Sequence, residues 1–78
     1  MLFYADVGDN VFTRKVENEL LKEYTPVMIN QFIPTPDGLV VIDFGYKDEP
    51  YEVTVYTHID RLTVNECVNE IMNLIRSL

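Results

Sequence analysis

Apolar side chains recur every three or four residues near both ends of this chain and every second residue in its middle. In the first such stretch, residues 11–24, the recurring positions are Phe12, Val16, Leu20 and Tyr24. An α-helix has 3.6 residues per turn, so this spacing predicts an amphipathic helix with one apolar face. The pair Thr25-Pro26 ends the helix, because a residue that precedes proline avoids the helical conformation.

The last stretch, residues 63–78, predicts a second amphipathic helix. Thr63 is followed three residues later by Glu66, which matches a capping box in which both side chains accept hydrogen bonds from backbone N–H groups. The apolar stripe of this helix consists of Val64, Val68, Ile71, Ile75 and Leu78. The stripe is too short for a coiled coil, so we expect the helix to pack across a sheet. The alternative is a free dimerisation helix.

Three extended segments lie between the helices, at residues 27–33, 39–46 and 51–58. The second alternates most strongly and is predicted to turn Val40, Ile42, Phe44 and Tyr46 to one face. The third alternates in the same way, with Tyr51, Val53 and Val55 on one face. The first is rich in residues that favour strands, but its pattern leaves the inner face ambiguous.

Two turns connect these segments. The sequence PTPDG (34–38) predicts a type I turn followed by a left-handed Gly38, and KDEP (47–50) predicts a second turn. We therefore expect one α+β domain over residues 1–78, a three-stranded antiparallel meander flanked by two helices in the order α-β-β-β-α. Residues 1–7 add either a short N-terminal strand or a strap over the core, with Asp9 or Asn10 capping the first helix.

The composition of the chain indicates whether it folds and in which compartment it is found. Apolar residues make up 47% of the 78 residues, too much for a disordered chain. The single cysteine cannot form an intrachain disulfide, which favours a reducing compartment. The N-terminus has no basic leader, and no apolar run reaches the length of a membrane span. We expect a soluble, cytoplasmic protein.

The charge balance bears on which partners the domain can bind. Thirteen acidic and six basic residues give a net charge of −7, which opposes binding to nucleic acid and to anionic membranes. The predicted element order is similar to that of double-stranded-RNA-binding domains. Those domains carry a basic cluster where this chain has Glu66 and Glu70, so we expect no direct nucleic-acid binding.

Catalytic and metal-binding signatures are missing from the sequence. Cys67 falls on the apolar stripe of its helix between acidic neighbours, and pairing it with His58 would make a dyad without any motif. One Cys and one His are too few for a zinc site, and the spacing of Asp6, Asp9 and Asn10 does not match a calcium loop. We expect no enzyme activity, no cofactor and no metal.

The candidate functional residues are therefore surface residues that could bind a partner. The sheet face opposite the helices is predicted to carry Leu39, Val41, Asp43, Glu52, Thr54 and Tyr56, which is half apolar and edged with acid. A second acidic and aromatic cluster around the second turn consists of Tyr46, Asp48, Glu49 and Tyr51. Apolar patches and carboxylates beside aromatic rings are typical of protein interfaces.

These features favour a non-enzymatic acidic module that docks on a basic or mixed surface of a larger protein. Small acidic domains of this kind resemble inhibitors and adaptors encoded by phages and mobile elements. A first alternative is a structural homo-oligomer, such as a homodimer that pairs through the exposed sheet face or the last helix. A second is a DNA mimic whose carboxylates imitate phosphates, which would require the acidic groups to line one face.

Overall fold

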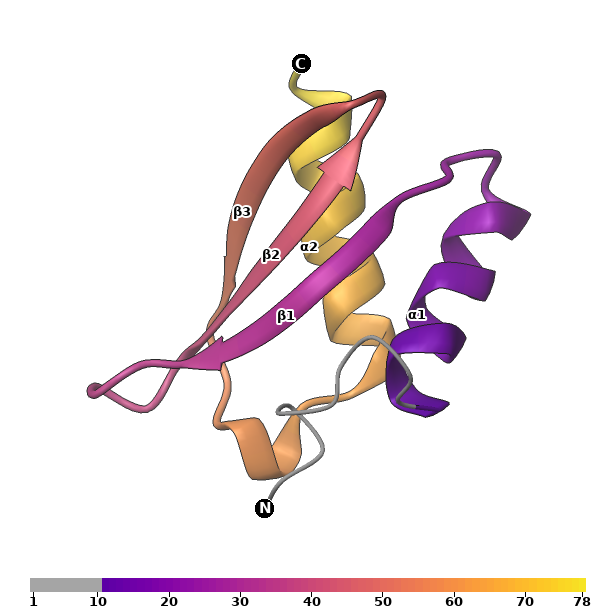
Figure 1. Cartoon of the computed structure of the whole chain (residues 1–78). Helices are drawn as coiled ribbons and strands as arrows, with labels where there is room; N and C mark the ends of the chain where they lie inside the picture. Colours follow the sequence, from indigo (N-terminus) through magenta and orange to yellow (C-terminus); the bar gives the residue numbers. More distant parts are fainter. Residues whose placement is uncertain (1–10) are drawn as a thin grey trace.

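The structure, a computed structural model, describes residues 11–78. Its elements are α1 (Val11–Lys22), β1 (Met28–Pro34), β2 (Val40–Tyr46), β3 (Glu49–Val55), the 3-10 helix η2 (Ile59–Arg61) and α2 (Val64–Arg76) (Figure 1). The strands form an antiparallel sheet in the order β1-β2-β3. The predicted α-β-β-β-α order is confirmed. The predicted N-terminal strand or strap, and the caps Asp9 and Asn10, lie outside the described residues.

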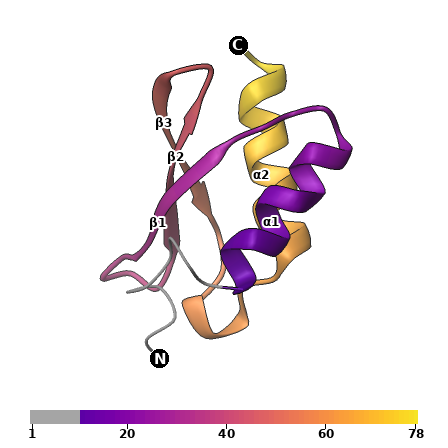
Figure 2. The same ribbon diagram turned by 45° about the vertical axis from the view of Figure 1, so that its right-hand side comes forward.

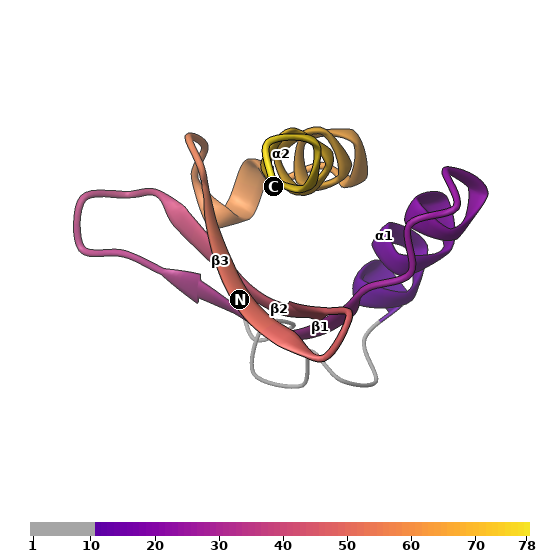
Figure 3. The ribbon, with the colours of Figure 1, turned by 90° about the horizontal axis from the view of Figure 1, so that it is seen from above.

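Both helices lie on one side of the sheet. Seen along the layers, the sheet curves around α2, and α1 runs beside the β1 edge (Figures 2 and 3). The two helices contact each other, α2 also contacts β3, and α1 contacts β1. We call the sheet face turned toward the helices the inner face and the opposite face the outer face.

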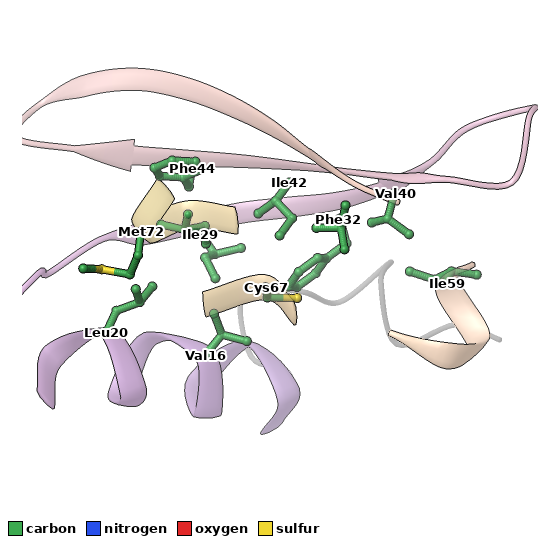
Figure 4. Close-up of a cluster of buried hydrophobic side chains, with 12 residues drawn as sticks. Val16, Leu20, Ile29, Phe32, Val40, Ile42, Phe44, Ile59, Cys67 and Met72 are labelled. Atoms are coloured by element: carbon green, nitrogen blue, oxygen red, sulfur yellow. The ribbon is translucent and has the colours of Figure 1, made fainter. Parts of the chain in front are cut away.

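The core fills the space between the inner face and the helices (Figure 4). Its buried apolar residues are Val16, Leu20, Ile29, Phe32, Val40, Ile42, Phe44, Val55, Ile59, Cys67, Ile71 and Met72. The predicted inward alternation of β2 is confirmed at Val40, Ile42 and Phe44, all fully buried. Ile71 on α2 is also fully buried, so the last helix is part of the core rather than a free dimerisation helix.

A β-bulge in β1 explains the ambiguous pattern of this strand. Ile29 lies opposite Phe44 and Phe32 lies opposite Ile42, with the register shifting between them. The extra residue, Asn30, lets two apolar residues three positions apart both face inward, which a regular strand does not allow.

The first hairpin turn forms as predicted. The Gly38 N–H donates to the Thr35 carbonyl at 3.0 Å, and the Thr35 N–H donates to the Leu39 carbonyl at 2.9 Å. Gly38 adopts a φ of +84°, the left-handed conformation that glycine takes without a steric penalty.

The second turn is shorter than predicted. Lys47 and Asp48 alone form it, with φ values of +51° and +65°, as in a type I′ turn. Glu49, predicted in the turn, is the first residue of β3, and Pro50, predicted at the edge of the strand, is the second. The strand ends at Val55 rather than at residue 58, so Tyr56 lies beyond it and is 78% exposed.

The ends of the helices differ in how closely they follow the sequence pattern. The capping box of α2 is confirmed: the Glu66 N–H donates to Thr63 Oγ1 at 3.2 Å, and the Thr63 N–H donates to Glu66 Oε1 at 3.0 Å. Tyr24 was expected on the apolar face of α1, and this expectation is wrong. It lies past the helix end with a φ of +57° and is 93% exposed.

Candidate interaction surface

The structure divides the predicted partner-binding residues between the two sheet faces. Val41, Asp43 and Glu52 lie on the outer face, because they alternate with the buried residues of β2 and β3. Tyr46, Glu49 and Tyr51 have the opposite phase and belong to the inner face. The remaining predicted residues, Leu39, Asp48 and Tyr56, lie outside the strands. This division follows the alternation predicted for the second and third strands, which puts Tyr46 and Tyr51 on the face opposite Asp43 and Glu52.

The predicted acidic and aromatic cluster at the second turn is not an open aromatic surface. Tyr46 and Tyr51 are half-buried and pack against the core. The Tyr51 ring lies 5.9 Å from the Phe44 ring between centroids, and Lys47 Nζ lies 5.4 Å from the centre of the Tyr46 ring. These contacts hold both rings against the hairpin and the core, and the binding of a partner by this cluster stays a prediction.

Two carboxylates face each other on the outer face. Asp43 on β2 is paired directly with Glu52 on β3. Asp43 accepts hydrogen bonds from the side-chain amides of Gln31 at 3.1 Å and Asn30 at 3.5 Å. Within residues 11–78, neither carboxylate forms an ion pair: the pairs formed among these residues are Lys22–Glu19 and His58–Asp60. Like charges directly opposite each other on a sheet repel, so this pair favours a cation from outside.

The basic residues are located elsewhere in the structure. They are Arg14, Lys15 and Lys22 on α1, Lys47 in the second turn, Arg61 in η2 and Arg76 on α2. The outer face of the sheet thus carries Asp43 and Glu52 but no Lys or Arg from the described strands. The charges that the described strands place on this face are therefore negative, and negative charge attracts cationic groups.

Apolar rows flank the acidic pair on both sides. In one row Ile33, Val41 and Thr54 lie opposite one another, all half-buried. In the other row Met28, Gly45 and Pro50 are aligned, and Met28 is 68% exposed.

A shallow hollow of about 520 Å³ lies at this second row, lined by Met28, Gly45 and Pro50 together with residues of the second turn. Strand β1 adds Met28 and Ile33 to the outer face, and the sequence pattern did not predict either residue there. The bulge at Asn30 changes the phase of the strand, and only the register reveals which side chains share the outer face.

Cys67 does not have the properties of a nucleophile. Its side chain is fully buried, and burial, with a smaller effect of the Glu66 charge, raises the pKa of the Cys67 thiol to about 12. His58 is exposed, and its Nδ1 accepts the Asp60 N–H at 3.1 Å, which caps η2. A buried neutral thiol and an exposed capping histidine do not make a catalytic dyad.

The described residues provide neither a metal-binding cluster nor a membrane-spanning helix. Among residues 11–78, no group of three or more His, Cys, Asp or Glu side chains is placed to hold a metal ion. The helices in this part of the chain are all too short or too polar to cross a membrane. Asp6, Asp9 and Asn10, considered above for calcium, lie outside the described residues.

No protein-family model, curated protein or solved structure matches the chain.

Proposed function

We propose that this protein is a non-enzymatic binding module whose outer sheet face docks on a basic or mixed surface of a larger protein. The observation that carries the proposal is the Asp43–Glu52 pair, which has no cation among the described residues and lies between two apolar rows. A partner's Lys or Arg would relieve the repulsion between the carboxylates, and the apolar rows would supply the area of contact. Such a module acts as an inhibitor or adaptor.

A cytoplasmic location suits this role. Cys67 is the only cysteine of the chain and is buried as a free thiol, a state that a reducing compartment preserves. The experiment that tests the proposal is capture of partners by the tagged protein from native lysate, at low and high salt, with identification by mass spectrometry.

Charge-neutral variants make that capture specific to the outer face. Asp43→Asn with Glu52→Gln removes two charges from the outer face. Glu23→Gln with Glu70→Gln removes one charge from the turn after α1 and one from α2, and serves as the matched control. We expect one partner that is lost at high salt, lost with the outer-face variant and retained with the control. A partner lost equally with both variants would show that net charge, rather than this face, determines binding.

A structural homo-oligomer is the second candidate, and the exposed Met28 on an apolar row of the outer face is the observation that favours it. The net charge of −7 opposes self-association. Light scattering separates the two: a dimer at all concentrations favours the homo-oligomer, and a monomer favours the binding module. DNA mimicry has less support, because the carboxylates of the described residues are spread over both helices, the outer face and the second turn.

A further inference from the structure

The free edge of β3 carries backbone groups that have no partner in residues 11–78. A two-residue turn makes Tyr46 and Glu49 a hydrogen-bonded pair, and bonded and non-bonded pairs then alternate along the hairpin. By the register of β2 and β3, Pro50, Glu52 and Thr54 fall on non-bonded positions. Their backbone groups therefore point away from β2, and Pro50 loses no ladder bond.

A contact on the opposite edge supports this assignment. The same alternation makes Phe44 a bonded partner of Tyr51 on β3, so its neighbour on β1, Ile29, must direct its N–H away from β2. The Ile29 N–H does so and donates to Glu17 Oε2 at 2.9 Å. The phase derived from the turn thus agrees with a hydrogen bond at the other side of the sheet.

The two edges of the sheet differ in how well they are protected against pairing with a further strand. The β1 edge is interrupted by three features that natural proteins use against strand pairing: the Glu17 carboxylate on the Ile29 N–H, the bulge at Asn30, and Pro34 at an outward position. The bulge and Pro34 lie on either side of Phe32, whose N–H also points outward by the same alternation. The β3 edge has Pro50 at one end only. No acceptor for the outward N–H groups of Glu52 and Thr54 is found among the described residues.

We propose that an extended segment of a protein partner, with Lys or Arg at alternate positions, adds to the free edge of β3 as a fourth strand. This inference rests on the proposed function and specifies how the partner binds. The Glu52 and Thr54 backbone groups would pair with the added strand, as in other proteins that bind peptides by strand addition.

The side chains beside the edge select the occupant. Alternate residues of an added strand lie on opposite faces. Those on the outer face would lie next to Glu52, where a hollow of about 420 Å³ is lined by Asp43, Pro50, Tyr51 and Glu52. Those on the inner face would lie next to Tyr51 and Val53, which are half-buried. Basic residues alternating with apolar residues match this arrangement. A second copy of the chain would instead bring a second Glu52 and a further charge of −7 to the same edge.

The test uses a short fluorescent peptide in which Lys and Val alternate, with binding followed by anisotropy at low salt. Thr54→Pro removes the outward N–H and leaves the ladder to β2 intact, as Pro50 does at the equivalent phase. Thr54→Val is the matched control because it keeps the N–H. We expect Thr54→Pro to weaken binding about tenfold, the loss of one main-chain bond and its geometry, and Thr54→Val to leave it unchanged.

A second measurement does not depend on the folding of the proline variant. The same peptide, N-methylated at every other residue in each of the two phases, is titrated against the unaltered protein. If the peptide pairs with β3, the peptide that is methylated in one of the two phases must bind about tenfold more weakly than the unmethylated peptide. Equal binding of all peptides, or no binding of the Lys-Val peptide, would overturn strand addition. A dimer that Thr54→Pro converts to a monomer would also overturn it, because the occupant would be a second copy. A lysate partner that needs Asp43 and Glu52 but tolerates Thr54→Pro would reject strand addition and leave the proposed function standing.

Discussion

The end of α1 offers a direct test of how the backbone, rather than side-chain packing, limits stability. The Thr25 N–H donates to the Leu20 carbonyl and the Tyr24 N–H donates to the Leu21 carbonyl, each at 2.9 Å. These two bonds form a Schellman motif with Tyr24 in the left-handed position, where glycine is the usual residue. Tyr24 has a φ of +57° and is 93% exposed. Its side chain thus gains little from burial and bears the steric cost of the conformation.

Replacing Tyr24 by glycine should therefore stabilise the protein. A non-glycine residue in the left-handed region costs roughly 1–2 kcal/mol, and the greater chain entropy of glycine offsets about 0.5–1 kcal/mol of the gain. The net increase in the free energy of unfolding is about 0.5–1 kcal/mol, or roughly 2–8 °C in Tm for a domain of this size.

Thermal and urea unfolding of Tyr24→Gly measure this increase, with Tyr24→Ala as the control. Alanine removes the same ring but keeps a Cβ in the left-handed conformation, so the alanine variant should not gain stability. If Tyr24→Gly were no more stable than Tyr24→Ala, the strain assigned to this position would be wrong.

Three other predictions concern single residues. Thr63→Ala should lower the free energy of unfolding by about 1 kcal/mol, because it removes the acceptor for the Glu66 N–H; an unchanged Tm would refute the cap. Thr13→Val should raise it by about 1 kcal/mol, since Thr13 Oγ1 is buried without a partner in the described chain; a loss measured by urea unfolding would reveal a hydrogen bond there. Cys67 should react with iodoacetamide at neutral pH only after denaturation, and prompt labelling of the native protein would contradict its burial. Because the pKa of its thiol is raised to about 12 from an ordinary value of 9.0, its contribution to stability is present below pH 9 and is lost as pH rises toward 12.

Much of the fold follows from local signals in the sequence. The capping box at Thr63 and the PTPDG turn both form as predicted, because each depends on a few neighbouring residues with strong conformational preferences. The alternation of Val40, Ile42 and Phe44 likewise identified the inner face of the central strand. Once the strands and helices were placed, the α-β-β-β-α order followed.

The features that the sequence did not reveal depend on register. The bulge at Asn30 brings Ile29 and Phe32 to the same face, which breaks the two-residue period on which strand assignment relies. The left-handed Lys47 and Asp48 shorten the second turn, although lysine is not typical of that conformation.

The candidate site was affected most by this dependence on register. Alternation within the third strand already placed Tyr51 on the face opposite Glu52, whereas the direct pairing of Asp43 with Glu52 is set by the turn between the strands. Ile33 and Met28 could be placed beside them only once the bulged register of β1 was known.

The closed β1 edge limits the size of any assembly built on the sheet. A sheet with two open edges can add one chain to each, and repeated addition leads to ribbons and cross-β fibrils. In residues 11–78 the Glu17 carboxylate, the Asn30 bulge and Pro34 block one edge. A chain that pairs through β3 therefore presents no second open edge to the next chain. Strand addition at β3 would terminate at a complex of defined stoichiometry rather than propagate.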